Sequence, residues 1–153
     1  MMQIFETRVQ YIPVGECTES ENFTSAGQVA KYLKGAFDNF LEQEQIWVVA
    51  LDGANQPKGR YMVSLGLANQ TQCHAREVFR TAIQMGAVSI IMAHNHPSGS
   101  LKPSDDDLGI TKNIFECGNL LGIPLLDHII LASAGWKSIK SSNPETFCHK
   151  IMS

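Results

Sequence analysis

Residues 94–107 read HNHPSGSLKPSDDD, and the rest of the chain is organised around this stretch. The apolar run Val88–Ala93 immediately before it is typical of a buried strand. Side chains two apart on a strand point to the same face, so His94 and His96 are expected to converge at the strand's end. The Pro-Ser-Gly triplet that follows breaks the strand and turns the chain.

The second half of the stretch predicts the start of a helix. Ser104 is suited to cap it, and Asp107 follows three residues later in the first turn. Two histidines and one carboxylate form a ligand set for a catalytic divalent metal, most often zinc, which leaves a fourth position for water. Asp105 and Asp106 fit a solvated pair that offsets the positive end of the helix dipole.

A His-x-His pair beside a turn is also common as ordinary polar surface, and acidic residues suit the start of any helix. The pair alone therefore favours a structural interpretation. The full pattern is more demanding, because it requires His, one residue, His-Pro, six residues, Ser, two residues and Asp.

These residues resemble the JAMM motif of the JAB/MPN metalloproteases, H-x-H-x7-S-x2-D, with His94, His96, Ser104 and Asp107 at its fixed positions. The HNHPSG hexapeptide and the PS-x-x-D after it resemble the bacterial RadC-like branch of that superfamily. The resemblance implies that Zn²⁺ is held by His94, His96 and Asp107, and that the Ser104 hydroxyl helps to stabilise an oxyanion.

The resemblance extends to Arg76–Phe79 and Leu126–Ile130, and it covers about residues 42–140. It implies a zinc-dependent hydrolase, of peptide or isopeptide bonds, with a peptide or protein substrate. It also implies an alternative, a DNA-repair-associated accessory or interaction module with little or no hydrolase activity. We lean towards the enzyme.

A metal-activated water needs a base, and Glu44 is the candidate. Residue chemistry alone leaves open that Glu44 is a solvated residue at a helix–strand junction, or that Glu42 is the base instead. The resemblance favours Glu44, because RadC-like proteins carry a Glu eight residues before the residue ending that strand, here Asp52. Glu77 better suits a surface or packing role.

Asp127 and His128 are unusual within an otherwise apolar strand. They could form a buried hydrogen-bonded pair or orient a metal ligand, and we favour either role over direct ligation. His74 and His149 are interpreted as surface residues.

The expected fold is α+β or mixed α/β, with one mixed sheet flanked by helices in a single JAB/MPN-like domain over residues 1–153. The helix after Ser25 has a capping box with Gln28. In the helix over 73–85, Val78, Phe79, Ala82 and Ile83 are expected to be buried. The predicted strands are 3–12, 46–51, 60–68, 87–93, 125–131 and a short one over 136–141, and the remaining helix is 105–121.

Composition indicates which partners and which cellular environment to expect. The net charge of −3 gives no electrostatic footprint for nucleic acid, so DNA binding is possible but unsupported. The four cysteines lack CxxC spacing, which predicts free thiols in a reducing cytoplasm. We expect no signal peptide and no membrane span. No oligomeric state is predicted.

Overall fold

The computed structural model describes residues 23–37, 42–65 and 73–149, and near the N-terminus residues 3, 10 and 12–14. The strand predicted over 3–12 lies largely outside the described residues. The end of the helix predicted after Ser25, residues 38–41, also lies outside them.

One five-stranded sheet has the order β2-β1-β3-β4-β5. β3 and β4 are parallel, while the other neighbours are antiparallel. The predicted mixed sheet and the predicted hairpin of its first two strands are confirmed. The strands are β1 (Gln45–Leu51), β2 (Pro57–Leu65), β3 (Ser89–Asn95), β4 (Leu125–Ala132) and β5 (Gly135–Ser138).

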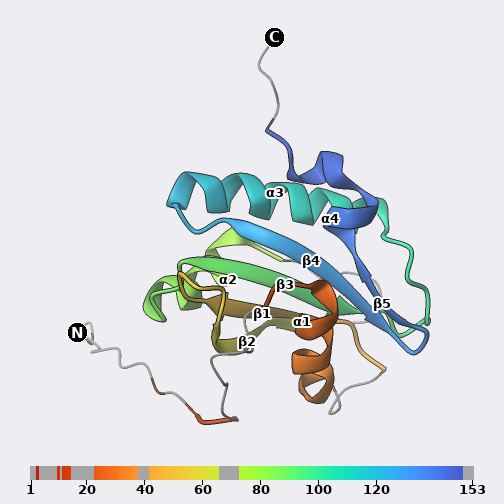
Figure 1. Cartoon of the computed structure of the whole chain (residues 1–153), viewed down its shortest axis with the longest axis horizontal. Coiled ribbons are helices and arrows are strands. Elements are labelled where there is room, and N and C mark those ends of the chain that lie inside the picture. The colour runs from red at the N-terminus through yellow and green to blue at the C-terminus, as the bar shows by residue number, and fades with distance from the viewer. Residues whose placement is uncertain are drawn as a thin grey trace.

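Helices cover both faces of this sheet (Figure 1). Ile90 and Met92 of β3 face the apolar cluster under α2 and α3, whereas Ile91 and Ala93 face the cluster under α1. The helices are α1 (Ala26–Leu33), α2 (Ala75–Gln84), α3 (Asp105–Leu121) and α4 (Ile139–Ser142), with the 3₁₀ turns η1 (Lys34–Ala36) and η2 (Pro144–Phe147). None of the described helices has the length and apolar character that a membrane span needs.

Glycines end two of these helices as their sequence context predicts. Gly86 follows α2 with φ +63° and Gly122 follows α3 with φ +73°. This left-handed backbone is strained for residues with a Cβ, so glycine there gives a sharp stop. The stop after α2 leads into β3, and the stop after α3 leads into β4.

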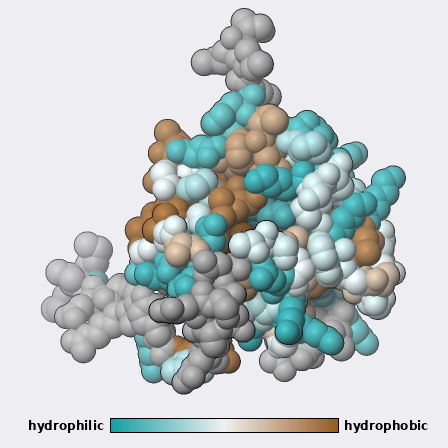
Figure 2. Space-filling view, viewed as in Figure 1, coloured by the Kyte–Doolittle hydropathy of each residue, from teal (hydrophilic) through white to brown (hydrophobic). Residues whose placement is uncertain are grey.

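Two predictions about the periphery were wrong. The strand expected over 136–141 ends at Ser138, because the Ser138 hydroxyl accepts a hydrogen bond from the N–H of Ser141 and caps α4 there. Ile83 is 56% exposed rather than buried. It borders an apolar groove between α2 and α3, which Leu120 also lines. Figure 2 shows apolar residues gathered on the part of the surface where the C-terminal end of α3 lies in Figure 1.

The three cysteines in the part of the chain that the structure describes are free thiols, as predicted. Burial raises the pKa of the Cys73 thiol to about 11. At neutral pH this thiol is therefore protonated and a poor metal ligand.

Candidate metal centre

Four side chains from three separate segments converge at one end of the sheet. One ligand atom from each of Glu44, His94, His96 and Asp107 lies within 4.8 Å of the other three. β3 supplies the histidine region, α3 begins with Asp107 in its first turn, and Glu44 directly precedes β1. The β1–β3 pairing Ile46↔His94 brings the Glu44 segment to the site.

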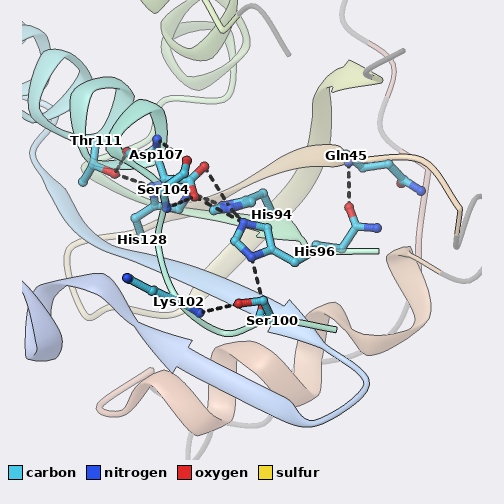
Figure 3. A network of polar contacts seen from close by, with 10 residues as sticks. Gln45, His94, His96, Ser100, Lys102, Ser104, Asp107, Thr111 and His128 are labelled. Carbon is cyan, nitrogen blue, oxygen red and sulfur yellow. Dashed lines mark hydrogen bonds and ion pairs between the residues drawn. The ribbon is translucent and has the colours of Figure 1, made fainter. Parts of the chain in front are cut away.

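His96 lies just beyond β3, where its backbone N–H donates to the Leu131 carbonyl at 2.8 Å. Its Nδ1 lies 2.8 Å from the carbonyl oxygen of Ser100. A carbonyl can only accept a hydrogen bond, so Nδ1 carries the proton. The neutral ring then has its lone pair on Nε2, the atom that points into the cluster (Figure 3).

His94 is oriented by a buried chain of hydrogen bonds. Its Nδ1 lies 2.7 Å from Nε2 of His128, whose Nδ1 lies 2.6 Å from the Thr111 hydroxyl. That hydroxyl donates to the backbone carbonyl of Asp107 at 2.6 Å. Because the Thr111 hydroxyl donates its proton to the carbonyl, it can only accept from His128 Nδ1. Nε2 of His128 is then unprotonated and accepts from Nδ1 of His94.

The direction of this chain leaves the lone pair of His94 on Nε2, facing the cluster. Burial, followed by the proximity of His94, holds the pKa of His128 well below its ordinary value. A neutral His128 is the form that the chain requires, because a protonated ring could not accept from His94.

Asp107 joins helix capping to the cluster. Its Oδ2 accepts from the Ser104 N–H at 2.7 Å, and the Ser104 hydroxyl accepts from the Asp107 N–H at 3.1 Å. Its two oxygens lie 3.2 Å from Nε2 of His94 and of His96, respectively. Burial opposes the charge of Asp107, but the two imidazole rings beside it and the Ser104 N–H outweigh this effect and hold the carboxyl pKa well below its usual range.

The donor set fits a divalent cation. The Nε2 atoms of His94 and His96 lie 2.8 Å apart, and each is 3.2 Å from a carboxylate oxygen of Asp107. Tetrahedral zinc with ligands at about 2.0–2.2 Å separates its donor atoms by about 3.4 Å. Small side-chain shifts would open this space, and both Nε2 atoms and the carboxylate could then bind one cation.

The other candidates separate clearly. Glu44 is half-buried and joins the cluster, whereas Glu42 is exposed and does not belong to it. Ser104 caps α3 as predicted and lies beside Asp107 (Figure 3). Asp105 and Asp106 are exposed in the first turn of the helix, as the dipole argument expects. Glu77 forms ion pairs with Arg76 and Arg80 away from the site, and His74 and His149 are exposed.

Asp127 and His128 do not form a side-chain pair, because they point to opposite faces of β4. His128 reaches His94, as the ligand-orienting hypothesis proposed. Asp127 instead accepts from the Ser138 hydroxyl and the Lys140 N–H, and so holds the start of α4. The strand's alternation thus divides two neighbouring polar residues between the site and the scaffold.

Sequence reasoning missed two residues of the network. Thr111 lies one helical turn after Asp107, a spacing that places both on one face of α3. Asn95 lies between the two histidines and bonds to the segment that carries Glu44. The sequence shows where each residue lies relative to a metal ligand. It does not show that Thr111 contacts His128 or that Asn95 contacts Gln45, because these partners are distant in the sequence.

A family model and several known proteins match this chain over most of its length. A RadC-like JAB domain model matches residues 23–144. A UPF0758 protein of Enterococcus faecalis is 40% identical over 120 residues, which cover 78% of this chain and 51% of that protein. The UPF0758 protein GSU0386 of Geobacter sulfurreducens is 40% identical over 123 residues, covering 80% and 53%.

UPF0758 protein tlr1707 of Thermosynechococcus vestitus is 42% identical over 101 residues, covering 66% of this chain and 40% of that protein. The chain spans about half the length of these curated relatives. Their names state no activity. On the family match and on identities of 40% across most of its length, the chain belongs to the RadC-like JAB domain family.

Proposed function

We propose that this domain is a zinc-dependent hydrolase that cleaves peptide or isopeptide bonds. The observation that carries the proposal is one cluster in which two imidazole Nε2 atoms and Asp107 converge, with a second carboxylate, Glu44, beside them. Three ligands plus a nearby carboxylate match the needs of metal-assisted hydrolysis. Membership of the RadC-like JAB family supports it.

His94, His96 and Asp107 would hold the ion, which the N₂O donor set suits to zinc. When bound, Zn²⁺ would supply Lewis acidity that lowers the pKa of a ligated water from about 15.7 to about 7. The buried chain through His128 and Thr111 would fix the tautomer and orientation of His94. These contacts make the site ready for a ligand before substrate arrives.

Glu44 would act as the base that takes a proton from the attacking water. The water oxygen would bond to the amide carbonyl carbon, the C–N bond would break, and Glu44 would return the proton to the leaving amine. Ser104 uses a lone pair of its hydroxyl oxygen for the helix cap. Its proton can therefore be donated to the oxyanion.

The test compares hydrolysis and bound metal in matched variants. Purified, zinc-loaded protein is incubated with a mixed peptide library and with isopeptide-linked lysine peptides, and new amines are identified by mass spectrometry. Glu44→Gln should keep the metal and lose about 10²–10⁴-fold in kcat, the usual contribution of a positioned base. His94→Ala should lose both. Glu42→Gln is the control, because it changes an exposed carboxylate two residues away.

Hydrolysis that persists in metal-free His94→Ala would overturn the proposal. Stoichiometric zinc with no cleavage of any peptide or isopeptide would instead favour the accessory-module alternative. That outcome would be followed by mobility shifts with duplex and single-stranded DNA at several salt concentrations, because phosphate-dominated binding weakens steeply as salt rises.

A further inference from the structure

We propose that Asn95 is a positioning residue that holds Glu44 at the metal centre. The proposal rests on the function proposed above, because it assigns Asn95 an effect through the base. Asn95 lies between His94 and His96, and its side chain is directed to a different task from theirs.

The Asn95 side chain forms hydrogen bonds to the backbone on both sides of Glu44. Its Oδ1 accepts from the N–H of Gln45 at 2.6 Å, and its Nδ2 donates to the carbonyl of Gln43 at 2.9 Å. Figure 3 marks the bond at the Gln45 N–H. The two bonded groups belong to the residues immediately before and after Glu44. Asn95 is only 8% exposed, so this contact is shielded from water.

We call these two hydrogen bonds, from Asn95 to the backbone of Gln43 and Gln45, the Asn95 clamp. The clamp lies just beyond the end of the regular β1–β3 pairing. The β1–β3 ladder ends with the pair Ile46↔His94. One step further, the Asn95 side chain accepts a hydrogen bond from the N–H of the buried Gln45. A carboxamide offers an acceptor and a donor together, and both are needed here. Aspartate at this position would accept from Gln45 but could not donate to Gln43.

This arrangement ties the base to the metal ligands through one residue. Glu44 precedes β1 and lies outside the ladder, so its placement depends on the segment around it. A displacement of about 1 Å at a reacting group can cost about 100-fold in rate. Because Asn95 is next to both histidines in sequence, any movement of β3 would carry the ligands and the base segment together.

A double-mutant cycle tests the assignment. Asn95→Ala should keep stoichiometric zinc, lower kcat by about 10–100-fold and change KM by less than about threefold. In a Glu44→Gln background the same change should lower kcat by less than about twofold, because the positioned group is already gone. Asn95→Asp, which keeps one of the two bonds, should lie between Asn95→Ala and the unmodified protein. Asn113→Ala on exposed α3 surface is the control.

Amide exchange gives a readout that does not depend on activity. In metal-free protein, Asn95→Ala should remove protection from the Gln45 amide, whereas Asn95→Asp should retain it. With Co²⁺ in the site, Asn95→Ala should reproduce the change in visible absorption caused by Glu44→Gln. If the unmodified protein cleaves nothing, the proposed hydrolase activity fails. Amide exchange and the Co²⁺ spectra would still show whether Asn95 positions the Glu44 segment.

The assignment is overturned if Asn95→Ala leaves kcat and the Gln45 amide unchanged. It is also overturned if the substitution is equally damaging with and without Glu44, since that pattern indicates a general structural role. A Co²⁺ spectrum that responds to Glu44→Gln but not to Asn95→Ala would contradict it as well.

Discussion

Two helices in this protein begin with the same capping box and use it differently. At α1, the Gln28 side chain accepts from the N–H of Ser25 at 3.0 Å, and at α3 the Asp107 side chain accepts from the N–H of Ser104 at 2.7 Å. Gln28 has further bonds only to neighbouring Thr24 and Ser25 among the contacts described for it. The Asp107 oxygens also face two imidazoles.

The contrast shows how a site can be built on a folding motif. Both boxes satisfy backbone N–H groups at a helix start. At α3 the residue that accepts from the N–H of the cap is a buried carboxylate, and its two oxygens lie 3.2 Å from two imidazole Nε2 atoms. The helix cap thus fixes the position of a metal ligand, and the first turn of α3 serves both stability and the proposed chemistry.

The largest effect should come from Asp107→Asn. The amide oxygen can still accept from the Ser104 N–H, so the helix should start normally, but the negative charge is lost. We expect metal affinity to fall by more than about 100-fold, beyond the 10–100-fold typical of an outer hydrogen-bond partner. Competition titration against a chelator measures this. Unchanged affinity would mean that the α3 box is as purely structural as the α1 box.

A smaller loss should follow removal of the partners of His94. His128→Ala should weaken metal binding by about 10–100-fold, because His94 loses the acceptor that fixes its tautomer. Thr111→Val should have a weaker effect in the same direction. Asp127→Asn is the matched control on the opposite face of β4, and it should leave the affinity unchanged in the same titration.

Metal binding should also tighten as pH rises. In metal-free protein the pKa of His96 is raised, first by its hydrogen bond to Asp107 and against burial. A raised pKa contributes stability below the unfolded value of about 6.5, and that stability is lost as pH rises through the folded value. Metal must displace this proton, so affinity should increase by up to about tenfold per pH unit until the pH passes the folded pKa of His96.

Titrations at pH 6, 7 and 8 measure the pH effect, with thermal unfolding of metal-free protein alongside. The Asp107 carboxyl acts at the other end of the scale. Its depressed pKa contributes stability that is present above about pH 3.9 and lost as pH falls through the folded value. A metal affinity independent of pH would show that His96 is not protonated in the metal-free cluster.

The smallest effect should come from the α1 box. Gln28→Ala removes the acceptor for the Ser25 N–H and should lower the free energy of unfolding by about 1 kcal/mol. Metal affinity should not change, since this box lies at the helix on the opposite face of the sheet. Urea denaturation and metal titration of the same sample separate the two quantities. A change in metal affinity would contradict the claim that only the α3 capping box positions a metal ligand.

Local pattern was enough to predict much of the fold and of the cluster. Both capping boxes, the glycine stops after α2 and α3, and the buried run of β3 follow from short-range chemistry. The convergence of His94 and His96 follows from strand alternation, and Asp107 follows from its place in the first helical turn. Each of these inferences uses residues only a few positions apart.

What could not be predicted depends on how distant segments dock. Nothing local says which face of β4 turns towards α3, so the separate fates of Asp127 and His128 emerged only with the sheet. The Asn95 clamp joins residues 50 apart and requires the β1–β3 pairing. Ile83 fits an apolar helix face, yet α2 and α3 do not close over it.

The most direct test of the account is elemental analysis of the purified protein beside His96→Ala. The account predicts one zinc per chain in the unmodified protein and none in the variant, while both remain folded by circular dichroism. If the unmodified protein holds no stoichiometric zinc even after reconstitution, the three ligands do not close around an ion. That result would contradict the metal centre and the hydrolase proposed from it.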